Sequence, residues 1–167
     1  MSGAVVRPAT EGDARAIAEI RVETWRATYA GIVPQAVLDR MDVDRTVPGI
    51  CGILASDSHV LVADVPDRGI AGYVFSSPGR DADAAGFGEI EAIYVRPSAQ
   101  RLGLGKRLLR AAADDLRSRG FDTLVLWVLT DNGPARRFYE HAGFMPDGAV
   151  RTLDFDREPI EEIRYRR

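Results

Sequence analysis

The sequence predicts an α+β fold, with helices on both sides of a central sheet in an α/β three-layer arrangement. Residues 87–95 and 123–129 are apolar runs rich in β-branched and aromatic residues, as expected of strands. The second run is continuously apolar, which is typical of a strand buried on both faces. A stretch with helical periodicity separates the two runs. A chain of 167 residues with 46% hydrophobic content is long enough for a single domain, residues 1–167, with its own core.

The N-terminal part shows helical patterns followed by a pair of strands. Thr10 and Asp13 resemble a capping box, and Ile17 and Ile20 follow on one helical face. Residues 66–69, Pro-Asp-Arg-Gly, are typical of a hairpin turn. The elements expected here are a strand at 5–9, a helix ending near 29–31, a short helix from Pro34, a helical piece around 50–54, and strands at 59–65 and 70–76.

The C-terminal part alternates strands and helices. A polar loop at 78–86 precedes the strand at 87–95, which Arg96 and Pro97 end. Leu104, Leu108 and Leu116 then recur at helical spacing, and Gly120 stops the helix. After the strand at 123–129, the expected elements are a short helix at 135–142 and a terminal hairpin with strands at 150–155 and 160–165.

The loop at residues 100–105, Gln-Arg-Leu-Gly-Leu-Gly, predicts a cradle for a pyrophosphate group. Gly103 and Gly105 lack a Cβ, so the backbone can turn sharply and a ligand can approach its N–H groups. The helix that follows begins with N–H groups that have no intrahelical partner, at the positive end of its dipole. Such helix starts bind anions, and Lys106 and Arg107 add positive charge.

Other glycine-rich loops fit these residues less well. A P-loop needs a glycine and a Ser or Thr at the positions that hold Gln100 and Arg107. A dinucleotide-binding loop needs a third glycine where Leu108 stands, although Asp131 could serve as its ribose-binding acid. The glycines could also do no more than shape a turn. The hexapeptide alone leaves these alternatives open.

Residues 89–144 resemble the core of the GNAT superfamily of acetyl-CoA-dependent N-acetyltransferases. That family has a strand, a Gln/Arg-x-x-Gly-x-Gly/Ala loop with its helix, a second strand, and an Asn-x-x-Ala-x-x-Phe-Tyr-x-x-x-Gly-Phe helix. Both motifs occur in this order here, and they cover about a third of the chain. The second motif consists of Asn132, Ala135, Phe138, Tyr139, Gly143 and Phe144.

The resemblance implies a GNAT-like mixed, mostly antiparallel sheet of about seven strands, with a splayed parallel pair at the cofactor site and helices on both sides. It implies acetyl-CoA as the cofactor and coenzyme A as the product. The backbone N–H of Ile93 is expected to meet the thioester oxygen, and the loop N–H groups to hold the pyrophosphate. The expected cofactor-binding residues are Ile93, Tyr94, Val95, Arg101, Leu102, Gly103, Leu104, Gly105, Lys106, Asn132, Ala135, Phe138 and Tyr139.

Acetyl transfer to an amine needs a base, because an uncharged primary amine at pH 7 costs about 4 to 5 kcal/mol. Glu89 and Glu91 lie two residues apart on one expected strand, so both side chains leave the same face. Glu89 falls at the position of the general base in histone-type members of the family, so it is the first candidate for the base. Both could instead be surface carboxylates. The resemblance assigns Tyr139 the protonation of the leaving thiolate, whereas a core-packing role is the alternative.

The acceptor side is expected to involve Trp25, Tyr29, Phe87 and Glu89. Carboxylates there favour a cationic amine, and the aromatic rings can stack on a flat or apolar part of it. A small-molecule amine is favoured as the acceptor. A protein N-terminus or lysine, and a nucleotide- or acetyl-CoA-binding regulatory module without catalysis, remain alternatives.

Composition and charge indicate which kinds of partner the chain is not expected to bind. The formal net charge of −3 and a pI near 5.4 argue against a surface for nucleic acid or an anionic membrane. Cys51 is alone, and His59 and His141 lack ligand spacing, so no metal site is expected. With no signal peptide and no bilayer-spanning apolar run, the chain is expected to be cytoplasmic. A homodimer is a possible assembly.

Overall fold

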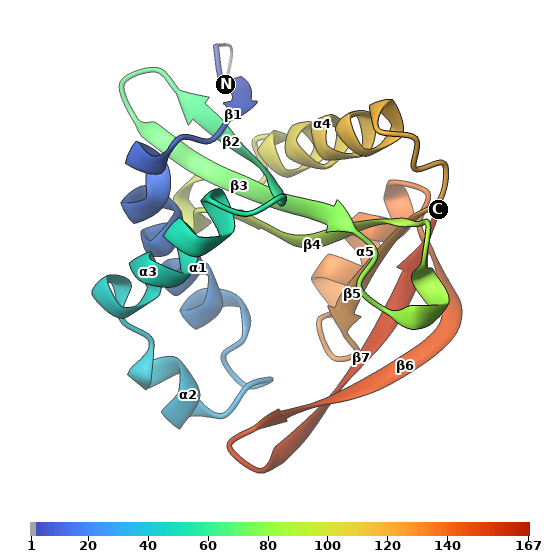
Figure 1. Cartoon of the computed structure of the whole chain (residues 1–167). Coiled ribbons are helices and arrows are strands. Elements are labelled where there is room, and N and C mark those ends of the chain that lie inside the picture. The colour runs from blue at the N-terminus through green and yellow to red at the C-terminus, as the bar shows by residue number, and fades with distance from the viewer. Residues whose placement is uncertain (1–2) are drawn as a thin grey trace.

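A seven-stranded mixed sheet spans the molecule (Figure 1). The computed structural model describes residues 3–167. The strands are β1 (Val5–Pro8), β2 (His59–Val65), β3 (Gly69–Pro78), β4 (Gly88–Val95), β5 (Leu124–Leu129), β6 (Met145–Phe155) and β7 (Glu158–Arg166). The helices are α1 (Ala14–Thr28), α2 (Gln35–Arg40), α3 (Val43–Leu54), α4 (Leu104–Ser118) and α5 (Gly133–His141). Within residues 3–167, no helix is both long and apolar enough to cross a membrane.

The order of the strands is β1-β2-β3-β4-β5-β7-β6, and only the β4–β5 pair among these neighbours is parallel. This order confirms the expected mixed, mostly antiparallel sheet. It is inconsistent with the dinucleotide-binding alternative, which requires a mostly parallel, doubly wound sheet.

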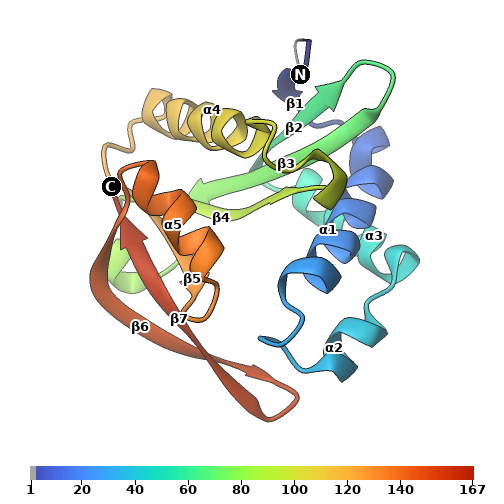
Figure 2. The same cartoon turned by 180° about the vertical axis from the view of Figure 1, so that it is seen from behind.

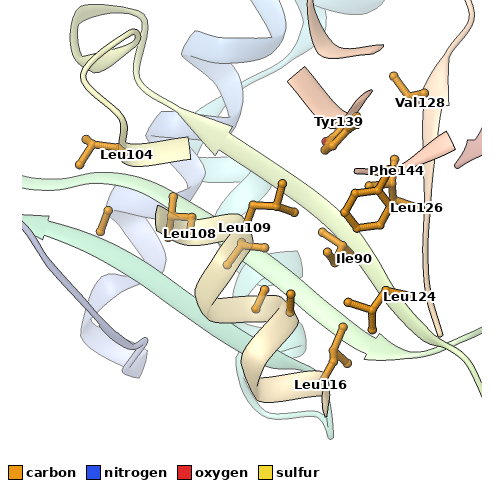
Figure 3. Close-up of a cluster of buried hydrophobic side chains, with 14 of the residues drawn as sticks. Ile90, Leu104, Leu108, Leu109, Leu116, Leu124, Leu126, Val128, Tyr139 and Phe144 are labelled. Carbon is orange, nitrogen blue, oxygen red and sulfur yellow. The ribbon is translucent and has the colours of Figure 1, made fainter. Parts of the chain in front are cut away.

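Helices cover both faces of the sheet, α1 and α3 on one face and α4 and α5 on the other (Figures 1 and 2). Successive residues of a strand point to opposite faces of the sheet. Val62 of β2 therefore packs under α1, and Ala63 packs under α4. Figure 3 shows Leu109 of α4 beside Ile90 of the sheet and Leu116 of α4 beside Leu124. The helical spacing seen in the sequence therefore corresponds to the buried face of α4.

The parallel strands β4 and β5 pair over only three residues. Gly88 to Ile90 lie opposite Leu124 to Leu126, and no further pairing follows. On the other side of β4, the register with β3 shifts so that Glu91 is an extra, bulged residue. A bulge bends and twists a strand locally. β4 therefore diverges from β5 after Ile90, which confirms the expected splay.

A smaller apolar cluster joins the N-terminal part to the terminal hairpin. Val33 and Leu38 pack against Leu129 of β5, with Trp25 and Phe155 at the edge of the cluster. The guanidinium of Arg40 also pairs with Asp156 in the hairpin turn. These contacts hold the segment between α1 and α2 against the end of the β6–β7 hairpin.

Three segments differ from the expectation. β7 begins at Glu158 instead of residue 160 and ends at Arg166 instead of residue 165. β6 begins at Met145 instead of residue 150. Met145 and Pro146 already pair with β7, the register then shifts, and the pairing resumes at Val150. The polar loop at 78–86 contains a short 3₁₀ turn, Ala82–Ala84, whose last residue is fully buried. That loop is therefore packed against the fold through Ala84.

Candidate active site

A cleft of about 660 Å³ opens where β4 and β5 diverge. Its walls are the C-terminal parts of both strands, the first turn of α4, one side of α5 and the end of α1. It brings together most of the residues that the sequence assigned to the cofactor. These are Ile93, Tyr94, Val95, Arg101, Gly103, Gly105, Lys106, Asn132, Ala135, Phe138 and Tyr139.

The start of α4 forms one end of the cleft. Gly103 precedes the helix in a left-handed conformation, with φ of 81°, and no side chain caps the helix there. A Cβ on Gly105 would lie 3.5 Å from the ring of Phe138, which is ordinary contact. The first-turn N–H groups of α4 are thus available to an anion, with Arg101 and Lys106 beside them. Leu102 is exposed and Leu104 is buried in the core, and neither residue lines the cleft.

Two side chains that line the cleft make hydrogen bonds to the backbone of neighbouring segments. The amide Nε2 of Gln100 donates to the carbonyl of Val95 over 3.2 Å, which links the loop to the end of β4. The side-chain oxygen of Asn132 accepts from the N–H of Ala135 over 3.2 Å. Asn132 therefore caps α5, and the sequence motif fixes the direction of that helix as well as lining the cleft.

Tyr139 lies on α5 and is only 9% exposed. Its ring makes edge contacts with Phe138 and Phe144, at centroid distances of 5.2 and 6.3 Å. Burial raises the pKa of its phenol above the ordinary value, and the neighbouring Tyr94 raises it further. Tyr139 therefore keeps its phenolic proton at neutral pH, and the residue lines the cleft.

Tyr29 and Tyr94 meet across the cleft. Their hydroxyl oxygens are 3.3 Å apart, although the residues are 65 positions apart in the sequence. Burial is the main cause that raises the pKa of Tyr29 above its usual range, and Tyr94, Tyr139 and Glu162 add to the effect. The residue expected on the acceptor side thus contacts one expected on the cofactor side.

The two carboxylates of β4 have different surroundings. The side chain of Glu89 is 1% exposed. Its Oε1 accepts from Nη2 of Arg80 over 2.6 Å, and its Oε2 accepts from Nε and the backbone N–H of Arg80. The side chain of Glu91 is 20% exposed and contacts Nη1 of Arg80 over 3.1 Å. Glu91 lines the cleft, whereas Glu89 lies outside its lining.

Two aromatic residues expected at the acceptor side also lie outside the cleft lining. The ring of Trp25 makes an edge contact with Tyr29, at 4.9 Å, and packs near Phe155. The guanidinium of Arg166 lies 4.9 Å from the centre of the Phe87 ring. Trp25 thus packs against Tyr29 of the cleft wall, whereas Phe87 precedes the first residue of β4, at the end of the strand away from the cleft.

Trp127 and Glu162 line the cleft, and sequence reasoning did not single them out. Trp127 stands in the apolar run of β5, where a core residue is expected, yet its indole Nε1 donates to Asp81 over 2.8 Å. Glu162 is brought to the cleft because β7 pairs with β5 and places it opposite Leu129. No local pattern gives that register, so no sequence signal could have identified Glu162.

Within residues 3–167, no group of three or more His, Cys, Asp or Glu residues is arranged to hold a metal ion. Cys51 is exposed. His59 pairs with Asp115 over 2.9 Å on the surface.

Comparison with known proteins relates the chain to one family. A model described as the acetyltransferase (GNAT) family matches residues 15–144. The Bacillus subtilis protein described as the uncharacterized N-acetyltransferase YuaI is 30% identical over 143 residues, which are 81% of this chain and 76% of that protein. Phosphinothricin N-acetyltransferase of Streptomyces viridochromogenes is 27% identical over 155 residues, which cover 90% of this chain and 79% of that protein. PaiA N-acetyltransferase of Thermoplasma acidophilum, solved in complex with coenzyme A, has a TM-score of 0.73 at 23% identity, covering 97% of this chain and 98% of that one.

Proposed function

Because this chain belongs to the acetyltransferase (GNAT) family and is an acetyl-CoA-dependent N-acetyltransferase, we propose that it acetylates a small-molecule primary amine by direct attack in a ternary complex. The observation that carries the proposal is the cleft between β4 and β5. One end has the N-terminus of α4 with Arg101 and Lys106, and Glu91 lies in the same cleft. Both substrates can therefore bind together, with Tyr139 beside them.

The residues at the start of α4 fit the pyrophosphate of acetyl-CoA. A Cβ on Gly103 would meet no atom within 4 Å, so the space beside the backbone is open to a ligand. The uncapped N–H groups and the positive end of the helix dipole supply the complementary charge. When bound, acetyl-CoA supplies an activated acetyl group as a thioester.

The proposed base is Glu91 instead of Glu89. Glu91 takes a proton from the acceptor ammonium, directly or through a water molecule, because it lines the cleft. Glu89 is buried and hydrogen-bonded to Arg80, so its proposed role is to anchor the guanidinium that also contacts Glu91. A buried carboxylate with a bidentate partner is costly to disturb, which suits an anchor better than a base.

The chain also supplies the groups for the later steps. The N–H of Ile93 is proposed to donate to the oxygen on which negative charge develops during attack. Tyr139 is proposed to give its phenolic proton to the leaving sulfur. Free thiols have a pKa of about 8.5, so the thiolate can leave without this proton, although more slowly.

The acceptor side favours a small molecule over a protein chain. The apolar cluster of Val33, Leu38 and Leu129, with the Arg40–Asp156 pair, closes the fold between the α1–α2 segment and the β6–β7 hairpin. An extended peptide would need an open groove at this place. A relative named for a small-molecule acceptor, phosphinothricin N-acetyltransferase, supports the same choice.

A panel of amines with purified protein and acetyl-CoA tests the proposal. Release of free thiol is followed continuously, and the acetylated product is identified by mass. We expect turnover with small primary amines, a loss in Glu91→Gln, and no comparable turnover with peptides carrying free N-termini or lysines. Acetyl-CoA binding without turnover across the panel would support the regulatory module instead. The cytoplasmic location and the homodimer stay predictions, the latter tested by light scattering after size exclusion.

A further inference from the structure

The charged residues that line the cleft are divided between its two ends. Arg101 and Lys106 stand at the start of α4, on the face of the sheet that α4 covers. Glu91 and Glu162 are the acidic residues of the lining. Glu162 lies on β7 opposite Leu129 of β5, in the face that the α1–α2 segment covers. The cleft is thus cationic where the phosphates are proposed to bind and anionic at the acceptor end.

The carboxylate of Glu162 is held in one orientation. Its side chain is 13% exposed, and its Oε2 accepts from Nε of Arg151 over 2.8 Å. Arg151 lies in turn over the ring of Trp127, with its guanidinium carbon 4.2 Å from the ring centre. A charged group positioned by such packed partners meets a ligand without loss of side-chain entropy at binding.

The arginines near the acceptor end do not balance the acids there. Arg80 is shared by Glu89 and Glu91, and Arg151 is shared by Glu162 and Asp81. Arg164, whose guanidinium carbon lies 5.7 Å from the centre of the Trp127 ring, is shared by Asp83 and Asp147. Three positive charges thus face six negative ones in a region that is partly removed from water. Uncompensated charge in such a place is costly, and a bound cation lowers the cost.

The reacting amine cannot be that cation throughout the reaction. It must lose its positive charge before it attacks the thioester, because only the neutral amine has a free electron pair. An acceptor cation that stays paired with Glu162 while the neutral amine attacks must therefore be a second group on the acceptor.

Tyr139 marks the same cleft as a ligand site independently of its acids. Its side chain is about nine-tenths buried and lines the cleft, and no protein group in residues 3–167 hydrogen-bonds to its hydroxyl. We propose that the acceptor is an amine carrying a second cationic group, and that Glu162 binds this group while the other amine reacts. This inference rests on the proposed function of the cleft.

Matched pairs of acceptors test the proposal, namely linear diamines of increasing length and the monoamines of the same chain lengths. For wild-type protein we expect kcat/KM to be at least ~10-fold higher for the best diamine than for its monoamine. Glu162→Gln keeps the shape and can still accept from Arg151. We expect it to raise the KM for the diamine about 10-fold, with kcat and the monoamine kinetics nearly unchanged.

Glu161→Gln is the control. It removes the same charge from the neighbouring residue, which is exposed, is hydrogen-bonded to Thr130 over 3.0 Å, and lies outside the cleft lining. Equal use of monoamines and diamines by wild-type protein at every length would overturn the proposal. An equal fall of kcat for both kinds of amine in Glu162→Gln would overturn it too, since that places Glu162 in the chemical steps.

A binding measurement separates this inference from the proposed function. Calorimetric titration of diamine and monoamine into the coenzyme A-loaded protein needs no turnover. Preferential diamine binding that Glu162→Gln abolishes supports the cation site even if no amine is acetylated. Turnover with monoamines and equal binding of both amines leaves the transferase intact and removes the cation site.

Discussion

Replacing Tyr139 by Phe removes one hydroxyl and separates catalysis from packing at the centre of the cleft. The ring contacts with Phe138 and Phe144 are kept, and no protein hydrogen bond is lost. We therefore expect the free energy of unfolding to change by less than about 1 kcal/mol. If Tyr139 protonates the leaving sulfur, kcat should fall by roughly 10²-fold, which corresponds to a barrier about 2.7 kcal/mol higher.

Tyr139→Ala is the matched variant for the packing role. It removes a ring from the core cluster, so we expect a loss of about 3 to 5 kcal/mol in the free energy of unfolding. The assays are kcat by thiol release, acetyl-CoA affinity by calorimetry and melting temperature for both variants. Wild-type turnover in Tyr139→Phe would refute the acid role. A fall in kcat with unchanged melting temperature and affinity would support it.

The pH dependence of Tyr139 has a defined sign. Burial raises its pKa in the folded protein above the value of about 10 in the unfolded chain. Its contribution to stability is therefore complete below about pH 10 and is lost as the pH rises through the folded pKa. Wild-type protein should lose stability more steeply than Tyr139→Phe in this alkaline range, as measured by denaturant unfolding at increasing pH.

Three further predictions concern other parts of the molecule. Gly103→Val should weaken acetyl-CoA binding about 10-fold or more, since its branched side chain enters space that is open to the ligand and a φ of 81° favours glycine there; unchanged affinity in the folded variant would remove this position from the cofactor site. Glu91→Gln should lower turnover most at neutral pH and recover part of it as pH rises, whereas Glu89→Gln should chiefly lower the melting temperature, and the reverse pattern would make Glu89 the base. The hydrogen bonds from Arg7 lower the pKa of Asp13 to about 2, so about 1–2 kcal/mol of stability present above pH 4 should be lost as the pH falls to 2, and acid unfolding of Asp13→Asn should lack this component.

The cofactor half of the cleft follows from local sequence. The glycine loop, the helix after it and the motif from Asn132 to Phe144 depend on turn conformation, helix capping and 3.6-residue periodicity, which act over a few residues. Their order along the chain carried the family resemblance, which implied the strand splay and the residues that line this half. The lengths of β6 and β7 were underestimated, because an irregular pairing between distant strands, not local propensity, determines them.

The half of the cleft proposed for the acceptor was decided by tertiary structure. The sequence placed Glu89 and Glu91 on one strand face, but the bulge at Glu91 and the burial of Glu89 under Arg80 distinguish them. Glu162 reaches the cleft through the register of β7 against β5. Bulges and strand register arise from packing between segments far apart in the chain. A single sequence therefore determined the fold and the glycine loop before α4, whereas long-range pairing determined which carboxylates line the cleft.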